Sequence, residues 1–197
     1  MSKQTPSQTV GPFFAYALTP ELYGRPGIVG NVLTEDDTPG EHIRIEGQVF
    51  DGEGATIRDA AIEIWQANNE GVYAHGADGR TRPADGVFTG FGRTGTDEQG
   101  RFWFQTVKPG AVPGPGNTLQ APHLNVVVLM RGLLSHVFTR IYFSDEAEAN
   151  ETCPILGLVE PERRATLIAN RVDRHGVPTY RLEIHLQGDR ETVFFDA

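Results

Sequence analysis

Residues Ile45–Tyr73 read IEGQVFDGEGATIRDAAIEIWQANNEGVY, and this stretch decides the fold of the chain. Apolar and polar residues alternate on both sides of the run Asp51–Gly54, which is rich in the residues that form tight turns. A second turn-like run, Asn68–Gly71, follows the second alternating segment. Two alternating segments joined by a short turn indicate a β-hairpin with one buried face. We therefore expect part of a β-sandwich here, with the ring of Trp65 buried.

The same alternation continues outside this stretch. Glycine and proline are spread along the whole chain, which is typical of many short strands joined by turns. The expected strands are His42–Phe50, Ala61–Gln66, Arg101–Val107, Leu124–Met130, Phe138–Phe143 and Tyr180–Gln187, with Val193–Phe195 as a short last one. The run Leu124–Met130 is almost continuously apolar and predicts a central strand that is buried on both faces.

Helices are expected to be few and short. The run Ser144–Glu146 favours the start of one short helix, since acidic residues stabilise its positive end. A second short helix is expected over Pro161–Asn170, with proline in the first turn. The fold class predicted from the sequence is therefore all-β, a sandwich of mostly antiparallel strands with one or two short helices.

The first 40 residues differ in character from the rest. They contain five prolines and little alternation, and Gly11–Tyr16 is too aromatic for a solvated tail. We expect residues 1–40 to form an extended arm that packs on a partner subunit, and residues 41–197 to form the sandwich domain. A loose N-terminus is the alternative.

Composition excludes several classes of function. A length of 197 residues fits one domain, and a net charge of −9 argues against binding to nucleic acid. No apolar run approaches the roughly 20 residues that a membrane helix needs, and the N-terminus lacks the apolar segment of a secretory signal. Cys153 is the only cysteine, so we expect no internal disulfide and a reducing cytoplasmic location.

The Ile45–Tyr73 stretch resembles the signature segment of the intradiol ring-cleaving dioxygenases. The other matching segments are Thr5–Pro12, Phe91–Thr94, Gly100–Phe104, Thr106–Gly110, Ala121–Asn125, Thr139–Phe143 and Glu191–Asp196. Together they cover almost the whole chain. The resemblance implies an oxidoreductase of aromatic compound catabolism, in the β-ketoadipate pathway, which opens catechols with ferric iron and O2.

The iron ligands of the family are two tyrosines and a His-x-His pair, and most of them are missing here. The positions that match them hold Arg80, Val112, His123 and Asn125. Arginine is a permanent cation and valine has no donor atom, so neither residue binds a metal. The other histidines are scattered along the chain. We expect no iron bound by this chain alone.

The likeness without the ligands implies a subunit that helps to form an active site on a partner. In two-subunit members of the family, a homologous beta subunit holds Fe(III), and higher hetero-oligomers are expected. Arg131 resembles the arginine that binds the carboxylate of protocatechuate. In the arm, Thr9, Gly11, Pro12 and Phe13 resemble residues that wall the substrate pocket, although relatives have tyrosine in place of Phe13.

Two other interpretations stay open at this point. In the first, the chain has the same β-sandwich fold but no part in catalysis, and is a transthyretin-like binding module. The second is a self-sufficient dioxygenase whose ligands are misaligned around Arg80 and Val112. Between Gly71 and Arg93 the only tyrosine is Tyr73, which matches a structural position of the family, so the second interpretation is disfavoured.

Overall fold

The computed structural model describes residues 8–11, 13–80, 88–174 and 176–196. Its 3-10 helices are η1 (Pro20–Tyr23), η2 (Pro115–Asn117), η3 (Leu156–Leu158) and η4 (Pro161–Leu167), and its α-helices are α1 (Phe14–Leu18) and α2 (Ala147–Thr152). The strands are β1 (His42–Phe50), β2 (Ala61–Trp65), β3 (Phe91–Gly95), β4 (Arg101–Val107), β5 (Val112–Pro113), β6 (Leu119–Gln120), β7 (His123–Leu129), β8 (Val137–Phe143), β9 (Ile168–Arg174) and β10 (Val177–His185). Strands therefore dominate, as the alternation predicts.

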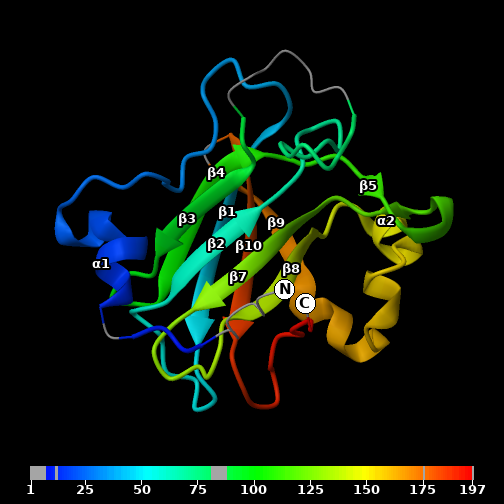
Figure 1. The fold of residues 1–197 in the computed structure, drawn as a ribbon. Coiled ribbons are helices and arrows are strands. Elements are labelled where there is room, and N and C mark those ends of the chain that lie inside the picture. The colour runs from blue at the N-terminus through cyan, green and yellow to red at the C-terminus, as the bar shows by residue number, and fades with distance from the viewer. Residues whose placement is uncertain (1–7, 12, 81–87, 175, 197) are drawn as a thin grey trace, which may run out of the picture.

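Eight strands form one continuous sheet in the order β3-β2-β7-β8-β9-β10-β1-β4. Pairing is antiparallel except between β1 and β10 and between β8 and β9. The β8–β9 contact is short, because it pairs only Tyr142 with Ile168 and Phe143 with Ala169. This narrow junction lets the sheet divide into two halves, β3-β2-β7-β8 and β9-β10-β1-β4, which form the two layers of a sandwich (Figure 1).

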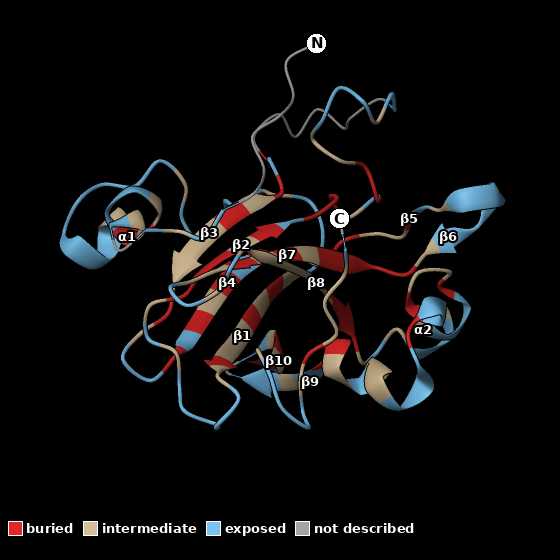
Figure 2. Cartoon of the chain, turned by 60° about the horizontal axis from the view of Figure 1, so that its bottom comes forward, coloured by how far each residue is buried: buried red, intermediate tan, exposed pale blue. Residues whose placement is uncertain are grey.

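The core lies between the two halves. Ile43 and Ile45 on β1 pack in one apolar cluster with Ile62 on β2, Leu124 on β7 and Ile184 on β10, and all five are fully buried. Burying one such side chain contributes about 1.5–3 kcal/mol. Because both halves supply the cluster, neither half has a complete core alone (Figure 2). The predicted all-β sandwich is confirmed.

The strands predicted from alternation agree closely with the structure. β1 and β4 have the expected bounds, and β7 begins at His123, one residue before its predicted start. The expectation that this strand is buried on both faces is wrong, because its burial alternates and Asn125 and Val127 are only half-buried. The expectation for Trp65 is also wrong, since 42 % of this residue is exposed. Trp65 ends β2 and its ring contacts other aromatic rings on the outer face.

Two other predictions are corrected. The segment Pro161–Asn170 is not one helix, because η4 ends at Leu167 and β9 begins at Ile168. The segment Val193–Phe195 makes only one isolated bridge, between Phe195 and Phe138, and is not a regular strand. β9 had no sequence prediction.

The arm contains α1 and η1, and its residues 30–33 then bind the two edge strands, β3 and β4. The backbone N–H of Leu33 donates to the carbonyl of Gln105 on β4, and Gly30 accepts from the N–H of Arg93 on β3. The arm thus links the two edge strands of the sheet. Whether residues 1–40 also pack on a partner stays a prediction. Among the described residues, no helix is long and apolar enough to cross a membrane.

Candidate functional site

The positions that the sequence analysis matches to the iron ligands of the family lie at one end of β7 and in the loops beside it. His123 and Asn125 stand at the start of β7, and Val112 stands on β5. Arg80 follows β2 in a loop whose residue Gly71 approaches the carbonyl of Ala111 closely. Gly71 has φ +77° and an added Cβ would lie 2.0 Å from that oxygen, so only glycine fits. The fold therefore gathers segments that are far apart in the sequence. We call this group of positions the vestigial site.

Arg80 is fixed in its loop. Its Nε and Nη2 atoms donate to the carboxylate of Asp78 at 2.5 and 2.7 Å, and Nη2 also donates to the carbonyl of Gly71 at 2.7 Å. The second oxygen of Asp78 accepts from the backbone N–H of Tyr73. These hydrogen bonds, chiefly those from Arg80, lower the pKa of Asp78 to about 2. Arg80 thus holds the loop together and offers no donor atom to a metal.

The two β7 residues of the vestigial site are also engaged. Nδ1 of His123 lies 2.7 Å from the carbonyl oxygen of Ala121, and the ring is buried. Burial, together with the positive charge of Arg140, lowers the pKa of His123 to about 4, so the ring is neutral at pH 7. The amide Nδ2 of Asn125 donates to the carbonyl of Trp65 at 3.2 Å and to the phenol oxygen of Tyr73 at 3.1 Å.

Arg140 is a charged neighbour of the vestigial site that the sequence reasoning did not single out. It lies on β8 directly across from Asn125 on β7, and Tyr142 lies across from His123. Its Nη1 donates to Gln120 at 2.8 Å and more weakly to the oxygen of Tyr142 at 3.4 Å. The cross-strand register would have placed Arg140 here, but that register is not visible in the sequence alone.

These residues do not fit a ferric ion. Val112 is buried and has no donor atom, and the only histidine of the set binds a backbone carbonyl with one ring nitrogen. The positive charge of Arg140 lowers the pKa of both Tyr73 and His123, so it acts on these two side chains. The same charge would repel a metal cation bound beside them. Burial raises the pKa of the Tyr73 phenol, so this tyrosine is neutral and not a ready anionic ligand. Across the described ranges, no group of three or more His, Cys, Asp or Glu side chains could hold a metal.

The remaining side chains at this end of the sheet form a small aromatic group. The Trp65 ring meets the Tyr73 ring edge-on at 5.6 Å and the His75 ring at 6.0 Å. Because Trp65 is 42 % exposed, this group is open to solvent on the outer face of β2. It is a polar and aromatic surface, and the hydrogen bonds of Asn125 fix its shape.

Arg131 lies at the other end of β7. It lies six positions after Asn125, which in a strand corresponds to about 20 Å. Its Nε pairs with the carboxylate of Asp59, and 58 % of its side chain is exposed. The structure therefore does not bring Arg131 together with the vestigial site of its own chain.

The arm residues expected at a substrate pocket lie apart from the vestigial site as well. Thr9 and Gly11 are exposed, and an added Cβ at Gly11 would meet nothing within 4 Å. Phe13 stands just before α1 and is 74 % exposed. Pro12 lies outside the described residues. In Figure 1, α1 lies on the side of the molecule toward which β7 points, whereas β5 lies on the opposite side.

Relatives of known function match the whole chain. The alpha chain of protocatechuate 3,4-dioxygenase from Burkholderia cepacia is 48 % identical, over 99 % of this chain and 98 % of that protein. The alpha chain of the same enzyme from Pseudomonas putida is 44 % identical, over 98 % of this chain and 96 % of that protein. The beta chain from Burkholderia cepacia is 36 % identical, but over only 57 % of this chain and 49 % of that protein.

Solved structures agree with the fold. A dioxygenase domain from a Streptomyces species superposes with a TM-score of 0.62 at 22 % identity, covering 94 % of this chain and 99 % of that one. A 3-chlorocatechol 1,2-dioxygenase from Rhodococcus opacus gives a TM-score of 0.63 at 22 % identity, covering 92 % and 71 %. The family model described as "Dioxygenase" matches residues 29–188. The chain therefore belongs to the intradiol ring-cleaving dioxygenase family.

Proposed function

We propose that this chain is the alpha-type subunit, without iron of its own, of a protocatechuate 3,4-dioxygenase. With a homologous partner it forms the pocket in which protocatechuate and O2 become 3-carboxy-cis,cis-muconate. The observation that carries the proposal is the separation within β7. The vestigial site lies at one end, and the exposed Arg131 lies about 20 Å away, beyond the other end. Arg131 can serve a ring-cleavage site only if that site belongs to another chain.

Arg131 is suited to hold the carboxylate of the substrate. Its ion pair with Asp59 uses Nε and orients the guanidinium group. Within the described part of the chain, its two Nη atoms make no other hydrogen bond, so that edge is free for a planar, bidentate contact. Such a contact would fix the orientation of the aromatic ring before the reaction.

The arm would form one wall of the same pocket. The backbone around Gly11 has open space beside it, so another chain can approach it closely. Phe13 presents an exposed ring, which would exclude water from the substrate without the hydrogen bond that a tyrosine would add. Thr9 and Pro12 would complete this wall.

The partner would be a homologue of the beta chain and would hold Fe(III). The likeness of this chain to a beta chain supports a shared fold for the two subunits. Fe(III) would supply the activation of the catechol and O2, whereas this chain would position the substrate. A free, buried Cys153 supports a reducing compartment, and we propose a cytoplasmic location. The transthyretin-like module is not favoured, because alpha chains of this enzyme match the full length.

Purification of the tagged chain from its native host tests this function. We expect a coloured complex that contains a second chain at equal stoichiometry. Mass spectrometry should identify that chain as a homologue with two tyrosines and a His-x-His pair at the ligand positions. Ferric iron bound by tyrosinate absorbs visible light, so the spectrum reports the metal directly.

Separating the two chains and measuring iron in each would locate the metal. Iron in the second chain alone supports the proposal. A colourless single chain would contradict it and leave only the sandwich fold. One tightly bound iron per copy of this chain, without a partner, would instead support a self-sufficient dioxygenase.

A further inference from the structure

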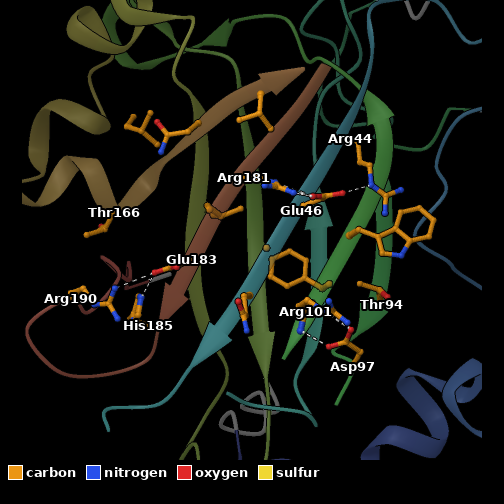
Figure 3. A pocket seen from close by; sticks show the side chains of 18 of the residues that line it. Arg44, Glu46, Thr94, Asp97, Arg101, Thr166, Arg181, Glu183, His185 and Arg190 are labelled. Carbon is orange, nitrogen blue, oxygen red and sulfur yellow. Dashed lines mark hydrogen bonds and ion pairs between the residues drawn. The ribbon is translucent and has the colours of Figure 1, made fainter. Parts of the chain in front are cut away.

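A broad groove crosses the outer face of the sheet half β9-β10-β1-β4. It has a volume of about 1260 Å³, and charged side chains from all four strands line it (Figure 3). Strand alternation explains its character, because Ile43 and Ile45 point into the core and leave Arg44 and Glu46 on the outer face. The vestigial site and Arg131 lie on other elements and line no part of this groove.

One carboxylate in the groove is shared by three arginines. Glu46 accepts from Nε of Arg44 at 2.8 Å and from Nη2 of Arg181 at 3.0 Å, and Nη1 of Arg174 lies 3.7 Å away. Burial raises the pKa of Glu46, but the hydrogen bonds from Arg44 and Arg181 outweigh it and lower the pKa. Glu46 is therefore ionised, and it neutralises only one of the three positive charges.

Outside the cluster around Glu46, the groove carries no positive surplus. Arg101 binds Asp97 at 2.8 Å, Arg190 binds Glu183 at 3.3 Å, and Asp189 adds a further negative charge to the lining. The positive surplus thus belongs to the cluster around Glu46, whose outer arginines are open to solvent. The side chain of Arg174 is 53 % exposed and that of Arg181 is 41 % exposed.

The groove also has the composition of a protein contact. The guanidinium group of Arg44 lies 4.1 Å from the ring centre of Trp103, and Leu22 of η1 lines the groove as well. Tryptophan and arginine are the residues that most often dominate binding energy at protein interfaces. The groove is larger than the roughly 300–1000 Å³ of a typical small-molecule pocket. It therefore fits a protein segment with carboxylates better than a small acid.

The chain itself carries such a segment. Glu35, Asp36 and Asp37 are the only three consecutive acidic residues in the sequence, and all three are exposed. In the described part of the chain their carboxylates have no hydrogen bond or ion pair. By contrast, Asp145 and Glu146 are already paired with Lys108. The segment is a turn before β1, and the side-chain oxygen of Thr38 accepts from the backbone N–H of Glu35.

We propose that the groove around Glu46 is a contact between copies of this chain, filled by the acidic turn 35–37 of a second copy. Positive surplus and negative turn are complementary, although the chain as a whole has a net charge of −9. The two surfaces differ, so the contact is head-to-tail and generates a ring of copies where the rotation closes. This contact between copies does not depend on whether the chain contributes to an active site on an iron-holding partner.

Charge reversal on each side tests the contact in the full-length chain, with any partner that co-purifies. The groove variant combines Arg174→Glu with Arg181→Glu, and the turn variant combines Asp36→Lys with Asp37→Lys. Sedimentation velocity at low and high salt measures the association of copies. We expect each variant to weaken association about tenfold, and high salt to weaken the wild type. A chain with all four changes should recover most of the association, because the charges are again complementary.

Glu53→Lys, an exposed acid in another turn, is the matched control and should leave association unchanged. Should the groove variant fail to fold, the turn variant decides alone, since its side chains have no described partner. Unchanged association in the turn variant overturns the proposal, as does a wild type without association of copies. Loss of a different protein partner in the groove variant alone would assign the groove to that partner instead.

Discussion

At the scale of single residues, the side chains of the vestigial site are occupied by hydrogen bonds within the chain. Asn125 donates to Tyr73, and a neutral His123 faces a backbone carbonyl. Arg140 on β8 pairs with Asn125 on β7, and a hydrogen bond to Gln120 holds its side chain in place. Its guanidinium group is a permanent cation that only donates hydrogen bonds, so it cannot bind a metal. The hydrogen bonds and the positive charge at these positions therefore do not fit a ferric ion.

The role of Arg131 is a prediction at the same scale. Arg131→Ala should raise the KM of the assembled enzyme for protocatechuate about 10–100-fold, because a desolvated, bidentate ion pair is lost. The KM for catechol, which has no carboxylate, should change little. Steady-state oxygen uptake with both substrates measures the difference.

Arg58→Ala is the matched control for this experiment. Arg58 is similarly exposed and is also paired with one carboxylate, that of Glu98. It should leave both KM values unchanged. An equal rise of both KM values in Arg131→Ala would show that Arg131 supports the structure and does not select the substrate.

Sequence reasoning at this scale matched four positions to the iron ligands of the family, a match that stays a prediction, but it did not show what surrounds them. Arg80, Val112 and Asn125 follow from the spacing of motifs along the chain. Arg140 does not, because its place opposite Asn125 depends on the register between β7 and β8. Trp65 was misplaced for a related reason. A tryptophan in an alternating strand is usually a core residue, but here the strand ends in a surface group of aromatic rings.

At the scale of elements, one polar network ties several strand ends together. Asp145, after β8, accepts hydrogen bonds from Lys108 beyond β4, Arg171 on β9 and Tyr180 on β10, each at 2.9 Å. Burial opposes the charge on Asp145, but these three donors lower its pKa to about 2. The network joins both halves of the sandwich near the narrow β8–β9 junction.

Asp145→Asn should therefore destabilise the fold by about 1–2 kcal/mol at pH 7, after allowance for solvent screening. The pKa in the folded state lies below the ordinary value of 3.8. Asp145 thus stabilises the fold above that pH, and the contribution disappears as the pH falls toward 2. Urea denaturation at pH 7 and near pH 2.5 measures both effects, and the variant and wild type should differ less at the acidic pH.

Asp173→Asn is the control within the same network. Asp173 lies 3.8 Å from Arg171 and its side chain is 75 % exposed, so its loss should cost less than about 0.5 kcal/mol. Equal destabilisation by both variants would mean that the network around Asp145 adds nothing beyond a surface ion pair.

Most of the longer strands were predictable, whereas β3, β9 and the two-residue strands β5 and β6 had no sequence prediction. Strands with a clear period of two, such as β1 and β4, were predicted to the residue. β9 was missed because only Ala169 of its seven residues is fully buried, so the alternation is weak. The proline and charged residues of Pro161–Leu167 favour a helical start, but the segment forms a 3-10 helix before the chain enters the sheet.

At the scale of the whole molecule, the two proposed contacts with other chains use separate surfaces. Arg131 and the arm would complete a site on a partner, whereas the outer face of β9-β10-β1-β4 carries the groove around Glu46. The sequence predicted the first surface through its family motifs. It gave no sign of the second, because the groove exists only after four strands place their outward residues together.

Phe13 allows a test that separates the stability of this chain from its binding to a partner. Phe13 is 74 % exposed and occupies the N-cap of α1, where its side chain makes no capping hydrogen bond. Phe13→Asp should leave the melting temperature of this chain unchanged or slightly higher, because aspartate is a favourable N-cap. It should weaken binding to the iron-holding partner about tenfold or more, since a buried aromatic contact of the assembly is replaced by a charge.

Leu158→Asp on η3, at an 80 % exposed position, is the control and should leave both quantities unchanged. Equal partner affinity in Phe13→Asp and wild type would exclude Phe13 from the interface, whereas a large fall in melting temperature would show that it belongs to the core of its own chain.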